Sequence, residues 1–207
     1  MKRADAAFSA GDTRSARTAR SVTTHGRTDF AKLWVGQTIS ELGSRITREG
    51  LPLTALLTLH ATAGQMGILS AVSSASVLVF GLAAGVAVDR FKKRPLMIAT
   101  DLGRAALLAL IPLAAAKHVL SITVLVAVAI AVGTLTVLFD VAYQSYLPSL
   151  VAPEKLLDSN KRLTLSTSAA EMAGPALTGL LVQTVTAPLA ILFDAVSFLA
   201  SAWSLCA

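Results

Sequence analysis

The sequence lacks the residues and motifs that most metal proteins and hydrolases need. Cys206 is the only cysteine, which excludes a disulfide within the chain, and the three histidines do not form a metal-binding spacing. No Gly-x-Ser-x-Gly or His-Glu-x-x-His motif is present. We therefore expect no metal, no cofactor and no enzymatic activity. An intramembrane hydrolase using Asp140, Glu171 or Asp194 is a weaker alternative, because no paired catalytic constellation supports it.

Charge is also scarce, and hydrophobic residues dominate in its place. Charged residues make up 14% of the chain and hydrophobic residues 54%, with a mean hydropathy of +0.67. Soluble proteins are about one-quarter charged, so this composition indicates a membrane protein with lipid as a partner. The net charge is +6, but the basic residues lie before Leu33 or beside apolar stretches rather than in a groove interleaved with aromatics. We expect no nucleic-acid partner.

Residues 1–29 contain no apolar run. They are rich in Arg, Ser, Thr and Ala, and a secretory signal peptide is excluded because its apolar core is missing. The composition predicts a disordered cytoplasmic tail. An organelle transit peptide is the alternative interpretation.

Residues 30–207 are predicted to form one all-α transmembrane domain, a bundle of six membrane-spanning helices. The apolar stretches are long enough to span a bilayer. Basic residues gather in the tail and in 90–94 and 155–162, whereas the intervening loops contain only Lys117. This asymmetry predicts a multi-pass protein of the cell membrane with both termini in the cytoplasm. The expected helices are 30–59, 66–89, 95–116, 119–139, 163–185 and 188–207.

The first of these stretches combines an apolar face with four charges that sum to zero. Glu41, Arg45 and Glu49 follow one another at a spacing of four residues, so neighbours can neutralise each other within the membrane. With Arg48 they would line a water-filled path for substrate or protons. The alternative is a helix that lies flat on the membrane surface.

Further residues that we predict for this substrate or proton path lie on two later stretches. Asp140, Tyr143 and Gln144 share one helical face near a membrane edge, before Pro148 begins a polar loop. Glu171 has no acid or base within four residues, so its burial without a local cation would favour the protonated form and suit proton exchange. A structural, hydrogen-bonded Glu171 is the alternative.

Asp101 and Arg104 are spaced for a local ion pair. They lie near the start of the third predicted helix. We expect this pair near the lipid headgroups, with a structural role rather than a part in substrate contact.

The stretch Gly81–Pro95 runs from small residues into a basic cluster. Its pattern, Gly-x-x-x-Asp-Arg-x-x-x-Arg-Pro, resembles the signature between the second and third helices of major facilitator superfamily transporters. The resemblance implies that Gly85, Asp89, Arg90 and Arg94 belong to a gating loop. The family usually has a glycine where this chain has Lys92, so the turn must be made differently. The alternative is a chance cytoplasmic loop that follows the positive-inside rule.

Two later stretches extend the resemblance. Residues 139–163 are similar to the branch that includes the enterobactin exporter and macrolide efflux proteins. Residues 170–179 resemble the Gly-Pro motif of facilitator antiporters, which implies a helix-packing role for Ala170, Gly174, Pro175 and Gly179.

Together these resemblances imply the N-terminal half of a twelve-helix, proton-coupled exporter of small molecules or drugs. The second half is absent from residues 30–207, so a partner half is expected as a separate chain or through a homodimer. The alternative is a membrane-embedded interaction or assembly protein without transport activity of its own.

Overall fold

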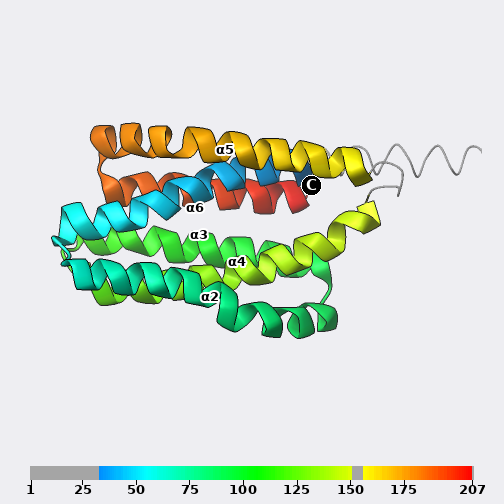
Figure 1. The fold of residues 1–207 in the computed structure, drawn as a ribbon, viewed down its shortest axis with the longest axis horizontal. Coiled ribbons are helices and arrows are strands. Elements are labelled where there is room, and N and C mark those ends of the chain that lie inside the picture. The colour runs from blue at the N-terminus through cyan, green and yellow to red at the C-terminus, as the bar shows by residue number, and fades with distance from the viewer. Residues whose placement is uncertain (1–32, 151–155, 207) are drawn as a thin grey trace, which may run out of the picture.

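The computed structural model describes residues 33–150 and 156–206, and the predicted tail 1–29 lies outside this part. The described residues form six helices and no strand, which confirms the all-α class. The helices are residues 33–59, α2 (Ala63–Arg90), α3 (Lys93–Ala116), α4 (Ile122–Leu150), α5 (Leu156–Val185) and α6 (Ala187–Cys206). They run side by side as an elongated bundle (Figure 1).

Short turns separate the helices at one end of the bundle. Thr62 caps α2: its hydroxyl accepts from the Gln65 N–H, and the Gln65 side chain accepts from the Thr62 N–H, so two backbone donors are satisfied. The turns after the first helix, α3 and α5 each contain one residue with positive φ, namely His60 (50°), His118 (55°) and Thr186 (106°). Both histidines are therefore turn residues.

Four helices are long and apolar enough to cross a membrane. They are Ala63–Gly81 of α2, Lys93–Ala116, Ile122–Pro148 and Ala187–Cys206. Helix 33–59 carries four charges in two turns, and α5 contains Glu171 and many hydroxyl side chains, which lower their mean hydropathy. The expectation of six spans is therefore supported for four helices by composition, and the spanning of the other two remains a proposal.

The α4–α5 region differs from its prediction. We expected Pro148 to begin a polar loop, but α4 continues through Pro148 to Leu150. Proline has no N–H to donate to the carbonyl four residues earlier, so the last turn of α4 lacks one helical hydrogen bond. The predicted loop residues Asp158 and Arg162 instead lie in the first turns of α5, where their side chains pair at 3.4 Å. Their four-residue spacing stabilises the start of that helix.

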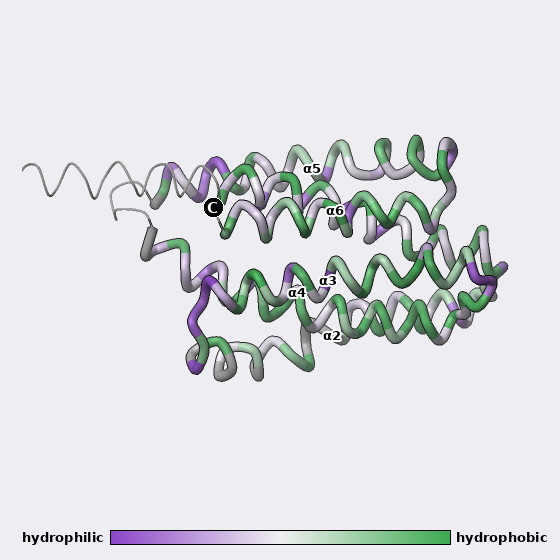
Figure 2. The backbone as a smooth tube through the Cα atoms, turned by 180° about the vertical axis from the view of Figure 1, so that it is seen from behind, coloured by the Kyte–Doolittle hydropathy of each residue, from purple (hydrophilic) through white to green (hydrophobic). Residues whose placement is uncertain are grey.

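The packing divides the bundle into a tight part and a looser part. α3 packs against both α4 and α6, and α4 packs against α2 (Figure 1). α5 lies on the opposite side from α2, beside α6 and helix 33–59. Apolar colouring runs along the helices, and the hydrophilic segments gather mainly near their ends (Figure 2). As a result α4 and α5 border the same face of the bundle without packing tightly on each other.

Candidate functional site

Arg45 links helix 33–59 to α5. Its Nη2 lies 3.0 Å from Glu41 Oε1 on the same helix and 2.7 Å from Glu171 Oε1 on α5. The local Glu41–Arg45 pair is the one that the spacing predicted. The expected pairing of Arg45 with Glu49 is not made within the described residues, because the guanidinium turns toward α5 instead. Glu49 is exposed.

The expectation for Glu171 is wrong in two respects. Its side chain is 53% exposed rather than buried, and it has a cation partner in Arg45. Sequence distance concealed this partner, since the two residues are 126 positions apart. Glu171 is therefore a carboxylate held by a salt bridge at the surface of a groove.

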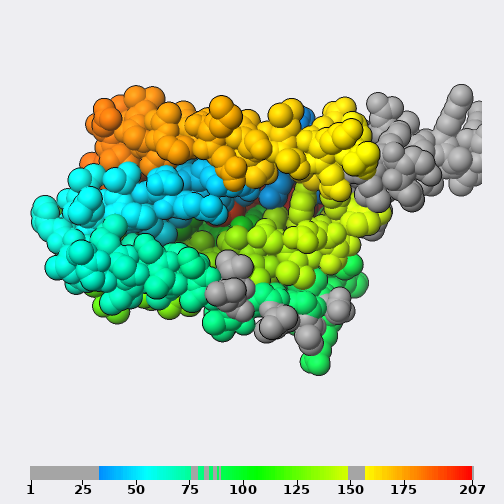
Figure 3. All heavy atoms as spheres, in the orientation of Figure 1, coloured from blue at the N-terminus to red at the C-terminus, as the bar shows by residue number. Residues whose placement is uncertain are grey.

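This groove lies between α4 and α5 and has a volume of about 660 Å³. It brings together three of the predicted pathway residues, Tyr143, Gln144 and Glu171, with hydroxyl side chains of α5 beside them. Figure 3 shows a hollow between α5, in orange and yellow, and α4, in yellow-green. The hydroxyl and amide lining comes from Gln144, Asn160, Thr164, Thr167 and Ser168. Such a lining can hydrogen-bond a polar substrate or water.

Asp140 and Tyr143 differ in their surroundings. Asp140 is exposed and does not line this groove. The Tyr143 ring stacks on Phe139 with centroids 6.1 Å apart, and its buried hydroxyl has no hydrogen-bond partner within the described residues. A buried hydroxyl without a partner lowers the stability of the fold.

A second cavity, of about 320 Å³, lies among helix 33–59, α2, α4 and α6. Arg48 lines it together with Thr47, Thr136 and Asp194. The pathway role of Arg48 remains a prediction. Our site prediction omitted Asp194, although it is 1% exposed and accepts a hydrogen bond of 3.0 Å from Ser197 Oγ. The available signal was a single acid within the otherwise uncharged residues 187–206.

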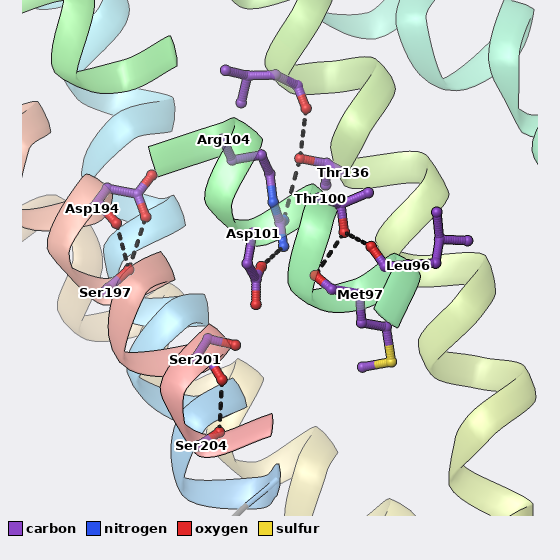
Figure 4. A network of polar contacts seen from close by, with 11 residues as sticks. Leu96, Met97, Thr100, Asp101, Arg104, Thr136, Asp194, Ser197, Ser201 and Ser204 are labelled. Carbon is purple, nitrogen blue, oxygen red and sulfur yellow. Dashed lines mark hydrogen bonds and ion pairs between the residues drawn. The ribbon is translucent and has the colours of Figure 1, made fainter. Parts of the chain in front are cut away.

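A buried arginine contacts Thr136 and Phe198, two residues that line this cavity (Figure 4). Arg104 forms an ion pair with Asp101, and its guanidinium lies 4.4 Å from the Phe139 ring centroid and 4.0 Å from that of Phe198. Arg104 also donates to Thr136 Oγ1 at 3.4 Å. The predicted ion pair is confirmed, and its expected place near the headgroups remains a prediction. Both side chains lie inside the bundle, where the aromatic faces and the carboxylate offset the cost of burying the charge.

The α2–α3 junction is made without glycine. Phe91 (φ −113°, ψ 153°) and Lys92 (φ −65°, ψ 124°) are both extended, so two residues reverse the chain with no positive φ. Arg90 is exposed, Lys93 Nζ donates to Ser145 O at 3.1 Å, and Arg94 Nε donates to Leu205 O. The basic cluster thus binds the carboxyl ends of α4 and α6. An added Cβ at Gly81 or Gly85 would have no neighbour within 4 Å among the described atoms, and the Asp89 side chain lies outside the described residues.

Two of the four residues predicted for helix packing, Ala170 and Gly174, lie at positions where helices meet. Ala170 is buried, and a Cβ at Gly174 would lie 2.7 Å from Arg45 Cβ, so this glycine permits the approach of helix 33–59. Pro175 is exposed, and a Cβ at Gly179 would have no neighbour within 4 Å among the described atoms. The packing roles of Pro175 and Gly179 remain predictions.

An apolar helix bundle with four candidate membrane spans defines the class of a membrane protein. The chain belongs to the family of transmembrane secretion effectors, transporters of the major facilitator superfamily, whose pattern it matches over residues 21–207. No curated protein and no solved structure matches the chain. This is the superfamily whose signature the stretch Gly81–Pro95 resembles.

Proposed function

We propose that this chain is half of a secondary active transporter, a proton-coupled exporter of small molecules close to the enterobactin and macrolide efflux branch. The observation that carries the proposal is the salt bridge between Arg45 and Glu171 beside the α4–α5 groove. It joins a charged residue of helix 33–59 to a carboxylate at the surface of a polar groove. Membership of a transporter family supports transport as the activity, with a small molecule as the substrate.

A proton and Arg45 compete for the same carboxylate. When Glu171 takes up a proton, its attraction to the guanidinium falls, and Arg45 keeps only Glu41, 3.0 Å away. The charge link between helix 33–59 and α5 is then lost. When the proton leaves, the link forms again, and the two helices are drawn together. Coupling follows if substrate in the groove favours one of these two states.

Glu171 has the exposure that this exchange needs. At 53% exposed, it can meet water from the groove without an opening of the bundle. Gly174, one turn further along α5, lets the two helices approach closely at this point. The salt bridge can therefore break and form again without repacking of large side chains.

The polar face of the bundle supports a second six-helix half as a partner. Asp140, Gln144 and Glu171 are exposed on α4 and α5. Charged and amide groups facing hydrocarbon are expensive, so a second set of helices is needed to enclose them around a water-filled path. We propose that this half is supplied by another chain segment or by a second copy. Both termini lie in the cytoplasm in this arrangement, and the protein resides in the cell membrane.

The test is efflux from vesicles that contain the transport-competent assembly, driven by a pH gradient. Glu171→Gln keeps the shape of the side chain and removes the titrating group, so it should abolish gradient-driven efflux while membrane insertion is retained. Asp158→Asn is the control, since it removes an exposed carboxylate at the start of α5, outside the groove. Efflux by the Glu171→Gln variant equal to that of the parent would show that Glu171 is structural.

A further inference from the structure

A groove lies between α3 and α6 at the end of the bundle that carries the basic cluster. Its volume is about 530 Å³. The residues that line it are mostly apolar, and none of them is acidic. The lining residues are Arg94, Pro95, Ile98, Ala99, Leu102 and Cys206.

The groove faces outward from the bundle. Leu102 is 48% exposed, and Pro95, Ala99 and Cys206 are exposed as well. Both flanking helices, α3 and α6, are candidate membrane spans. The groove therefore opens toward lipid rather than toward the polar path between α4 and α5.

The candidate span of α3 begins at Lys93, so we expect the groove at the border between headgroups and hydrocarbon. Arg94 lies in the first turn of α3, and Cys206 is the last residue of α6. Leu102 lies roughly 12 Å deeper along α3, from a rise of about 1.5 Å per residue. The charged end of the groove is thus at headgroup level, while its apolar walls continue beside the acyl chains.

The exposed Arg94 guanidinium lies at the mouth of the groove. Arg94 is exposed, and its Nε donates to Leu205 O, which fixes one edge of the guanidinium. The part of the chain that the structure describes provides no further hydrogen bond to this side chain. Two more N–H groups of arginine suit bidentate binding of a phosphate. Exposed Lys92 precedes it, and no side chain caps the first N–H groups of α3, where the helix dipole favours an anion.

We propose that this groove binds an anionic phospholipid, with the phosphate on Arg94 and an acyl chain along Ile98, Ala99 and Leu102. The charge complementarity and the apolar walls favour a lipid over a free phosphate. Basic clusters at the cytoplasmic edge of a membrane helix attract anionic headgroups in general. Here the apolar groove adds a fixed place for one acyl chain. Because Arg94 also holds the end of α6, the bound lipid would support the packing of α3 and α6.

The experiment uses the full chain in nanodiscs of phosphatidylcholine with one-fifth phosphatidylglycerol. The chain is then transferred to detergent, which removes loosely bound lipid. Native mass spectrometry measures the lipids that remain bound. The parent should keep phosphatidylglycerol in preference to phosphatidylcholine. Arg94→Gln should reduce the retained phosphatidylglycerol several-fold. Arg162→Gln, the same change at an exposed arginine of α5 outside the groove, should not.

A second variant tests the groove without touching the charge. Ala99→Trp should fill the apolar part and lower phosphatidylglycerol retention, while Arg94 keeps its bond to Leu205 O. Equal losses in the Arg94 and Arg162 variants would reduce the effect to general surface charge and overturn the proposal. Full retention by Ala99→Trp would overturn it too. Displacement of the lipid by millimolar inorganic phosphate alone would show that the site is a phosphate site rather than a lipid site.

Discussion

Arg45 Nη2 lies 2.7 Å from Glu171 Oε1, and this contact joins two helices separated by most of the chain. Arg45 also keeps Glu41 at 3.0 Å, so one guanidinium serves two carboxylates. The two acids are not equivalent. Glu41 belongs to the same helix and stays close whatever α5 does, whereas Glu171 is near only while the two helices are together.

Because Arg45 pairs with two acids, removing Glu171 should lower the free energy of unfolding less than removing Arg45. Glu171→Gln leaves Arg45 paired with Glu41, so we expect a loss of about 0–1 kcal/mol in the free energy of unfolding, as for a partly exposed pair. Arg45→Ala leaves both Glu41 and Glu171 without a cation and should cost more. Thermal unfolding in detergent, monitored by circular dichroism, ranks the two variants. A Glu171→Gln variant less stable than Arg45→Ala would contradict the shared arrangement.

Gly174 and Gly179 provide a matched pair on α5. Gly174→Ala places a Cβ 2.7 Å from Arg45 Cβ, so helix 33–59 must shift, and we expect a loss of about 1–3 kcal/mol. Gly179→Ala meets open space and should be neutral or stabilise the helix by up to about 1 kcal/mol. Unfolding of both variants in the same detergent measures the difference. Equal effects would mean that Gly174 does not set the distance between the helices.

The ion pair inside the bundle should matter far more than the one on its surface. Asp101→Asn leaves Arg104 buried without its carboxylate, and breaking a buried pair costs about 3–5 kcal/mol. Asp158→Asn breaks a pair whose side chains are 70% and 59% exposed, and should cost about 0–1 kcal/mol. Folded yield and unfolding midpoint measure both. Equal losses of stability for the two substitutions would contradict the role of Asp101 as the partner of a buried Arg104.

The direction of the helices predicts which turns are accessible from each side of the membrane. The α2–α3 turn and the start of α5 lie near one end of the bundle, and the start of α2 and the end of α3 lie near the other (Figure 1). Lys92 and Asp158 belong to the first end by their place in these elements, and Ala63 and Lys117 to the second. In a Cys206→Ser background, single cysteines at the first two positions should react with a membrane-impermeant thiol reagent only after the cells are opened. Cysteines at the other two should react in intact cells. Labelling of all four from one side would exclude the six-span topology.

Local spacing in the sequence was sufficient for several features. The low charge and the long apolar stretches indicated an all-α membrane protein, because only segments that satisfy their own backbone can cross lipid. The Glu41–Arg45 and Asp101–Arg104 pairs followed from residues four and three apart, since a helix places such neighbours on one face. The pattern from Gly85 to Arg94 pointed to the transporter family to which the chain belongs.

Other features depended on how the helices pack. The sequence does not show which helices are neighbours, so it could not pair Arg45 with Glu171 or place Phe139 and Phe198 on either side of Arg104. The omission of Asp194 has the same cause, because an acid becomes part of a cavity wall only when several helices meet around it. Periodicity assigns each side chain to a face of its own helix. Only the tertiary structure decides what that face meets, since contacts between distant residues depend on the packing of whole helices.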